Sequence, residues 1–132
     1  IEGKKYQIKY LYDLLKLRKY NISHIKLPTF KSHTSFVNSS PYIQWYLIFQ
    51  EKSIIGSVYL NRDNSIGLNL LKQNKKIINQ CLQFIKVYFD KSKFSPSTIP
   101  DYLYFNVPTK NSKLIKYLIE FNCTPIQSSF KI

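Results

Sequence analysis

The sequence predicts an α/β protein of the α+β kind, in which helices flank a mixed, mostly antiparallel sheet within a single domain. Its 132 residues are enough for one hydrophobic core and leave little room for a second. Its composition, 44% hydrophobic and 16% aromatic, is typical of a folded chain. The apolar residues recur first at helical spacing, then at strand spacing, and then alternate between the two, which is the pattern of a sheet covered by helices.

The N-terminal quarter of the chain predicts two helices. Apolar residues at helical spacing cover about 6–19, and Asn21 follows as the residue that ends this helix. Pro28 and Thr29 are start signals for a second, short helix over about 29–38.

The middle of the chain predicts three strands and a long helix. The segments 42–50, 54–61 and 65–71 are rich in β-branched and aromatic residues and are separated by short polar turns, which favours an antiparallel meander. The period then changes, and 75–90 has one apolar and one polar face, so it predicts an amphipathic helix.

The C-terminal third predicts a strand, a helix and a final strand. A proline- and serine-rich loop over 91–100 leads to a strand at 101–107. The helix that follows ends before Asn122, a residue type that adopts the left-handed C-cap conformation readily. The segment 124–132 is predicted to close the chain as a strand, and no linker divides the chain into two domains.

The charge balance invites a nucleic-acid interpretation, which we keep as an alternative. The net charge is +13, and a strongly basic domain attracts phosphate-rich partners. Of the 20 basic side chains only Arg18 and Arg62 are arginine, whereas base readout and bidentate phosphate binding favour arginine. The longest basic cluster, 71–76, lies where a strand runs into a helix, and it suits one compact anion better than a duplex.

Several functional classes are disfavoured by what the sequence lacks. It contains no HxxxH, GxSxG or GxxxxGK motif and no paired carboxylates, so we expect no metal site, serine hydrolase or P-loop chemistry. Cys81 and Cys123 form no CxxC pattern and are expected to be reduced core residues of a cytoplasmic protein without a membrane span. Because residue 1 is not Met, a first strand missing from this sequence would be consistent with the pattern.

The strand-to-helix junction within 66–82 is the main functional signal. A helix N-terminus presents unpaired N–H groups and the positive end of the helix dipole, so it binds anions. Together with the order of elements, this junction resembles the GCN5-related N-acetyltransferase superfamily, in which a sheet splays open and acetyl-CoA lies in the gap. The family's QxxGxG loop reads Gln73 to Ile78 here, with Lys76 and Ile78 in place of the two glycines.

The two replaced glycines raise an energetic question. If the loop needs a positive φ at either position, the cost is about 1 kcal/mol or more per residue. Lys72, Lys75 and Lys76 could offset it, because a charge-assisted contact to phosphate is worth about 1.5–3 kcal/mol.

Two further stretches carry the resemblance, and it implies a set of site residues. The segment 111–123 is similar to the family's late helix, and 27–33 with the two strands after it is similar to small bacterial members. The implied catalytic groups are the Leu68 backbone, as an oxyanion donor, and a tyrosine of the late helix, as a proton donor. The family's tyrosine position falls on Leu118 here, and Tyr117, one residue away, is the candidate for this role. The implied cofactor-binding residues are Leu68, Asn69, Leu70, Gln73, Asn74, Lys75, Lys76, Ile77, Ile78, Asn106 and Asn111, and the implied substrate-binding residues are His33, Tyr42 and Tyr46.

The resemblance implies transfer of an acetyl group from acetyl-CoA to a primary amine of an unidentified acceptor. Asn64 and Ser65 stand where the family often has a glutamate base, so no carboxylate is carried over. We predict that Trp45 faces opposite to Tyr42 and Tyr46 along its strand. Two alternatives stay open, namely a catalytically inactive member of the fold that binds a partner, and a basic nucleic-acid-binding domain.

Overall fold

The computed structural model describes residues 1–19, 26–91 and 97–132. These ranges contain four helices and a four-stranded mixed sheet, so the α+β class is confirmed. Asn21 and His24 lie outside the described residues. The elements are α1 (Lys5–Lys16), α2 (Phe30–Asn38), β1 (Gln44–Gln50), β2 (Ser53–Leu60), β3 (Ser65–Leu70), α3 (Lys75–Tyr88), β4 (Tyr104–Phe105) and α4 (Ser112–Glu120).

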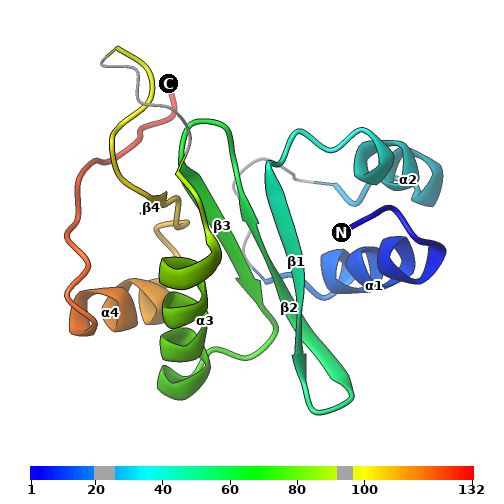
Figure 1. The fold of residues 1–132 in the computed structure, drawn as a ribbon, viewed down its shortest axis with the longest axis horizontal. Helices are drawn as coiled ribbons and strands as arrows, with labels where there is room; N and C mark the ends of the chain where they lie inside the picture. Colours follow the sequence, from blue (N-terminus) through cyan, green and yellow to red (C-terminus); the bar gives the residue numbers. More distant parts are fainter. Residues whose placement is uncertain (20–25, 92–96) are drawn as a thin grey trace.

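The strands follow one another across the sheet in chain order (Figure 1). β1, β2 and β3 form the predicted antiparallel meander, whereas β4 runs parallel to β3. The parallel step is possible because α3 carries the chain back between the two strands, as crossover connections do.

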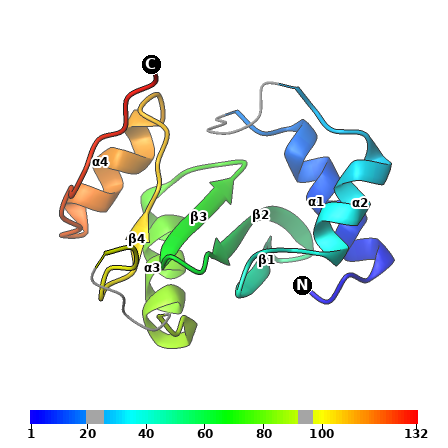
Figure 2. The ribbon, with the colours of Figure 1, turned by 90° about the horizontal axis from the view of Figure 1, so that it is seen from above.

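Helices cover both faces of the sheet (Figure 2). Val58, Leu60 and Leu68 point to one face and form the main core with α3 and α4. Trp45 and Leu47 point to the other face and pack on Ile8, Leu11 and Val37 of α1 and α2. Directly opposed residues of an antiparallel pair share a face, so the register of β2 and β3 assigns each side chain to one of these two layers.

The turn between β2 and β3 fixes the start of β4. Asn64 is fully buried with a φ of 68°, and its side chain donates to the Pro100 carbonyl at 2.9 Å. The Asp63 carboxylate accepts hydrogen bonds from Ser65 and, at 3.2 Å, from the Tyr104 hydroxyl. Burial pushes the pKa of Asp63 up, but these hydrogen bonds outweigh it and hold that pKa below its usual value. Asp63 is therefore a half-buried structural carboxylate and more than a solvated cap.

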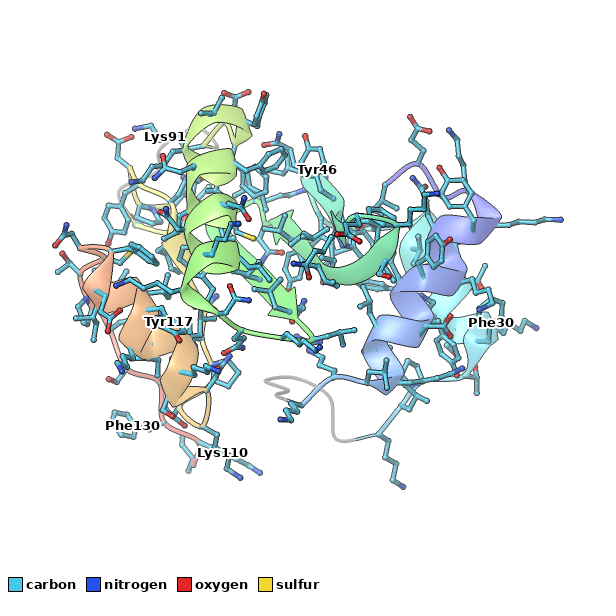
Figure 3. All side chains as sticks on the ribbon, turned by 90° about the horizontal axis from the view of Figure 1, so that it is seen from below. Phe30, Tyr46, Lys91, Lys110, Tyr117 and Phe130 are labelled. Carbon is cyan, nitrogen blue, oxygen red and sulfur yellow. The ribbon has the colours of Figure 1, made fainter. Side chains whose placement is uncertain are left out.

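The C-terminal elements differ most from the sequence-based expectation. The strand predicted over 101–107 shrinks to Tyr104–Phe105, and 124–132 forms no strand. Apolar side chains of this tail stay exposed, with Phe130 90% accessible and standing away from the helices in Figure 3. Alternating apolar residues specify a strand only where a sheet edge and a covering layer receive them, and neither meets this tail. The C-cap prediction is confirmed, because Asn122 has a φ of 64°.

The predicted helix over 6–19 is three residues too long at its C-terminal end. Leu17 donates its N–H to the carbonyls of Asp13 and Leu14, so the last turn tightens and the helix stops at Lys16. Arg18 consequently leaves the helix and lies beside the sheet, where it lines the pocket described below.

Candidate functional site

β3 and β4 are joined at one end and part at the other. Only two residue pairs connect them, Ser65 with Tyr104 and Ile66 with Phe105. The joined end is held by the Asp63 and Asn64 contacts of the turn. The ladder gives no β4 partner to the second half of β3 among the described residues, and Figure 2 shows β4 turning away toward α4.

The backbone groups of Leu68 and Leu70 point toward the side from which β4 has parted. The Ser65 carbonyl accepts from Asn61 and the Leu71 N–H donates to Ile55, both on the β2 side. The Ile66 carbonyl accepts from Asn106 on the β4 side at 3.4 Å. Backbone groups alternate in direction along a strand, so the even-numbered residues of β3 face β4. This is the orientation that the expected oxyanion role of Leu68 requires.

The N-terminus of α3 begins five residues after Leu70, the last residue of β3. Asn74 is its N-cap, and its side chain accepts from the N–H of Ile77 at 2.9 Å. The N–H of Ile78 bonds to the Asn74 carbonyl at 3.1 Å. The first-turn amides of Lys75 and Lys76 are therefore the ones left for an anion, while those of Ile77 and Ile78 serve the helix itself.

The expected strain at the two replaced glycines is absent. Lys76 and Ile78 are helical, and neither is among the residues with positive φ. The Ile78 side chain is 0% exposed and belongs to the main core, so it points away from any ligand at the helix end. The junction works as a capped helix without a glycine loop.

Basic side chains surround this helix end. Lys72 and Lys76 are exposed, and the Lys75 ammonium lies 3.4 Å from the Glu120 carboxylate and 5.8 Å from the Phe121 ring of the α4 end. Glu120 partly neutralises Lys75, whereas no carboxylate of the described residues pairs with Lys72 or Lys76, so both cations could meet an anion here.

Other residues of the expected cofactor set differ in how far they are exposed and in what they contact. Asn106 is exposed directly after β4, at the point where the strands part, and Gln73 is half-buried. Asn111 is buried and caps α4, because its side chain accepts from the Leu114 N–H at 3.3 Å. Tyr117 is half-buried on α4 and packs against the main core (Figure 3).

A pocket of about 190 Å³ lies on the other face of the sheet, between α1, α2 and the strands. Asn69 of β3 lines this pocket. Its two neighbours along the strand, Leu68 and Leu70, are the residues whose backbone groups face β4. The pocket is lined by Leu11, Leu14, Leu15, Arg18, Pro28, Ser32, His33, Phe36, Tyr42, Trp45, Ser57, Tyr59 and Asn69.

His33 is the imidazole of this pocket and is 6% exposed. Its Nε2 lies 3.1 Å from the Ile8 carbonyl oxygen. A carbonyl only accepts hydrogen bonds, so Nε2 carries the proton and Nδ1 is left as an acceptor. Burial lowers the pKa of His33, although the Ile8 bond acts in the opposite direction, so the ring is neutral at pH 7.

An aromatic cluster of Tyr42, Trp45 and Tyr59 forms one side of the pocket. Tyr42 stacks on Tyr59 with ring centroids 3.9 Å apart, and its edge meets Trp45 at 4.9 Å. The Tyr59 ring packs directly against Gly67, because a Cβ there would lie 2.0 Å from the ring. Burial is the main cause that raises the pKa of Tyr42, and Tyr59 raises it further, while the Arg18 charge lowers it. The net effect is a raised pKa, so the Tyr42 hydroxyl keeps its proton at neutral pH.

Two hydrogen-bond donors of the pocket residues have no partner. The Arg18 Nε and the Trp45 Nε1 atoms are buried, and no other buried side-chain nitrogen or oxygen in the described part of the chain lacks a hydrogen bond. Buried donors are normally satisfied, so each unpaired one calls for an explanation.

The structure brings together part of the expected substrate set. His33 and Tyr42 line the same pocket, whereas Tyr46 lies on the opposite face and packs on Phe84 and Phe89. The prediction that Trp45 faces opposite to both tyrosines is correct for Tyr46 and wrong for Tyr42. Tyr42 precedes β1, which begins at Gln44, so strand alternation does not govern its direction.

Sequence reasoning missed Arg18, Trp45, Ser57 and Tyr59 as pocket residues. A signal for Arg18 was present, since it continues the apolar stripe of Leu11 and Leu14 at a spacing of seven and four residues. An arginine on the apolar side of a helix is expected to meet a buried anion or to cover its end.

Within 1–19, 26–91 and 97–132, no group of three or more His, Cys, Asp or Glu side chains could hold a metal ion. Over the same ranges no helix has both the length and the apolar character to cross a membrane. Both cysteines are free thiols, and burial raises the pKa of Cys81 to about 11. Comparisons with protein-family models, curated proteins and solved structures find no significant match.

Proposed function

We propose that this protein transfers an acetyl group from acetyl-CoA to a primary amine of a small-molecule acceptor, and that it has the fold of the GCN5-related N-acetyltransferases. The observation that carries the proposal is the parting of β3 and β4 after two residue pairs. This parting leaves the backbone groups of Leu68 and Leu70 facing the open side, close along the chain to the capped N-terminus of α3.

The α3 end supplies what an anionic carrier needs. The amides of Lys75 and Lys76, with the side chains of Lys72 and Lys76, would hold the pyrophosphate of acetyl-CoA. Gln73, Asn106 and the Leu68–Leu70 backbone would line the pantetheine arm. Asn111 is occupied in capping α4, so its contribution to binding would come through the position of that helix.

The chain also offers groups for the chemistry. The cosubstrate supplies an acetyl group activated as a thioester. The N–H groups of Leu68 and Leu70 would donate to the carbonyl oxygen as negative charge develops there. His33 Nδ1 would take the proton of the amine as its nitrogen bonds to the acetyl carbon, and the Tyr117 hydroxyl would give a proton to the departing sulfur.

One edge and one face of β3 would bring the partners together. Leu68 and Leu70 would present the acetyl group from the side of β4, while the pocket that contains His33 and Asn69 would hold the acceptor. Asn69, which lines the pocket, stands between Leu68 and Leu70 along β3, where adjacent residues are about 3.3 Å apart, so this one residue would link the two sites.

Cofactor binding is tested by thermal unfolding with acetyl-CoA. A ligand present at a hundred times its Kd adds about 2.7 kcal/mol to the free energy of unfolding, so the midpoint should rise by several degrees. Lys76→Glu should weaken binding about tenfold or more, whereas Lys86→Glu at the other end of α3 should leave it nearly unchanged. An unfolding midpoint that does not rise at millimolar acetyl-CoA, or equal effects of the two variants on binding, would contradict the proposed site.

Transfer itself is tested by following free thiol release from acetyl-CoA with a panel of primary amines. We expect thiol release that depends on the amine, that falls about 100-fold in His33→Gln, and that falls less in Tyr117→Phe, because water can protonate the thiolate. Tight acetyl-CoA binding without any transfer would instead identify a non-catalytic binding protein with this fold.

A further inference from the structure

The pocket that would hold the acceptor is lined mainly by apolar and aromatic side chains. Tyr42 stacks on Tyr59, and Trp45 meets Tyr42 edge to face with ring centroids 4.9 Å apart, so aromatic rings form one side. Much of the remaining lining comes from leucines of α1, namely Leu11, Leu14 and Leu15. The cavity volume of about 190 Å³ compares with roughly 150 Å³ for an apolar cavity that admits benzene, so it has room for a single ring with a short substituent.

The charge of the pocket disfavours an ammonium group. Among the described residues that line it, Arg18 is the one with a permanent charge, and none is acidic. No carboxylate of the described residues forms an ion pair with Arg18. The Arg18 charge is felt inside the pocket, because it lowers the pKa of the Tyr42 hydroxyl against the larger effect of burial. An alkylammonium ion would therefore lose its water and meet a like charge, with no carboxylate to offset either cost.

His33 limits the acceptor in a second way. Burial holds the pKa of His33 below its ordinary value of 6.5, whereas the pKa of an alkylammonium such as lysine is about 10.4. Proton transfer from an alkylammonium to this imidazole would be unfavourable by a factor of roughly 10,000, yet the nitrogen must lose that proton before it can attack. The lone pair of an aromatic amine is delocalised into the ring, so an aromatic amine is uncharged at pH 7 and needs no such step.

We propose that the acceptor is a primary aromatic amine with a single ring, held with its ring against the aromatic cluster and with its amino nitrogen toward the Nδ1 atom of His33. This assignment deepens the proposed function and rests on it. The amine nitrogen bonds to the acetyl carbon, the carbon–sulfur bond breaks, one amine proton passes to His33 Nδ1, and the thiolate takes a proton from Tyr117. The amine is neutral before and during this transfer, so no ammonium has to be accommodated beside His33.

Two isomeric probes test the selectivity of binding. The isomers para-methylaniline and benzylamine contain the same atoms, but at pH 7 only benzylamine is charged. Trp45 is the single tryptophan and it lines the pocket, so the shift of its one indole N–H signal in a proton–nitrogen correlation spectrum reports occupancy. We expect a saturable shift with para-methylaniline and binding of benzylamine that is about tenfold weaker or worse.

Two matched pairs of variants test the cause of the selectivity. Arg18→Gln removes the cation and Ser32→Asp adds a carboxylate at an exposed lining position of α2, so each should bring the two affinities about tenfold closer. Ser32 is the third residue of α2, where a carboxylate favours the helix that Thr29 caps, so Ser32→Asp keeps the test open if Arg18→Gln does not fold. The controls Arg62→Gln and Ser35→Asp change exposed residues outside the lining and should leave the ratio of affinities unchanged. Far-ultraviolet circular dichroism and the unfolding midpoint show whether each variant is folded.

Transfer separates this inference from the proposed function. With acetyl-CoA at pH 7, kcat/KM for thiol release should be about tenfold higher or more with para-methylaniline than with benzylamine. Equal binding of the two isomers, no binding of para-methylaniline, or equal effects of each variant and its control would overturn the inference. Faster transfer to benzylamine would also overturn it while supporting the transferase. Selective binding of para-methylaniline in a protein that does not bind acetyl-CoA would reject the transferase and leave the pocket assigned to neutral aromatic amines.

Discussion

His33 is the residue whose surroundings most directly link stability to pH. The folded protein holds its ring neutral, since burial lowers the pKa of His33 below the unfolded value of about 6.5. Above that pH both states carry a neutral ring and the residue adds no pH dependence. Below it the unfolded chain takes up a proton that the folded protein resists, so the free energy of unfolding falls until the pH passes the folded pKa.

We therefore expect the urea midpoint to fall as the pH is lowered below about 6.5, and to fall less in His33→Gln. Both proteins carry His24→Gln, so that the only other histidine does not titrate. The measurement is urea unfolding at pH 7.5 and 5.5. A pH dependence that is the same with and without His33 would contradict the assigned burial of a neutral ring.

Gly67 is the residue that sets the position of the Tyr59 ring. A methyl group at this position would lie 2.0 Å from the Tyr59 Cζ, and Tyr59 is itself stacked on Tyr42. Gly67→Ala should destabilise the protein by about 1–3 kcal/mol, because the stacked rings must move together. The same substitution in a Tyr59→Ser background should cost much less, and chemical denaturation of the double-mutant cycle measures this coupling. A cost that persists in the Tyr59→Ser background would mean that the backbone, and not the ring, opposes the methyl group.

The sequence identified some pocket residues and missed others for a physical reason. His33 lies in the predicted second helix, and the resemblance to the acetyltransferases implies that it binds substrate. Arg18 was not assigned, because the amphipathic pattern continued past Lys16 and did not reveal that the chain leaves the helix there. Trp45 was assigned to a face correctly, but its unpaired indole N–H depends on neighbours that only the fold provides.

At the scale of elements, α3 explains why glycine is not needed at its start. Lys76 is an exposed helical residue, so Lys76→Gly should cost about 1 kcal/mol in helix propensity and should not tighten acetyl-CoA binding. Ile78→Ala should cost about 2–5 kcal/mol, because this side chain is completely buried, and Ile78→Gly should cost about 1 kcal/mol more.

Urea unfolding measures these costs, and thermal shift with acetyl-CoA measures binding. A stabilising Lys76→Gly substitution would contradict the helical conformation of the junction. Tighter acetyl-CoA binding in Lys76→Gly would instead show that the lysine side chain obstructs the ligand.

The elements that the sequence predicted well are those whose own pattern of apolar residues is enough to locate them. The α3 pattern carries five buried side chains on one face, and the three antiparallel strands are joined by short turns, so both could be located within two residues. β4 and the C-terminal segment 124–132 could not be located in this way. Their pairing depends on whether β3 still has a free edge beside them, and the sequence of 101–107 or 124–132 contains no information about that edge.

For the whole molecule, the net charge of +13 predicts a fold that salt stabilises. Ion pairs such as Lys9–Asp13 and Lys91–Asp101 involve exposed groups and contribute little, while the excess positive charge repels itself. Raising NaCl from about 20 to 300 mM shortens the Debye length below 10 Å and should raise the unfolding midpoint. Lys86→Glu, which reduces the net charge to +11, should show a smaller rise.

A midpoint that falls with added salt would mean that specific ion pairs outweigh the repulsion. From the same charge we expect only weak, salt-sensitive binding to nucleic acid. Tight duplex binding with a steep salt dependence, in a protein that binds no acetyl-CoA, would favour the nucleic-acid alternative.

The fold class, the order of elements as far as α4 and the junction before α3 could be predicted from the sequence, whereas the final strand predicted over 124–132 is absent. The parting of β3 and β4 is a property of the whole molecule, because it depends on the Asp63 and Asn64 contacts that hold one end and on α4 that leads the chain away. The pocket likewise depends on two helices and three strands meeting, so only its separate residues were visible in the sequence.

The register of β2 and β3 has a consequence for how this protein could evolve. Ser57 and Asn69 face the pocket while their neighbours Val58 and Leu68 face the main core. A slip of either strand by one residue would bury the polar pair in hydrocarbon and turn the aliphatic pair toward the pocket. The pocket lining can therefore change by single substitutions at these alternate positions, but an insertion or deletion within either strand would disrupt the pocket and folding together.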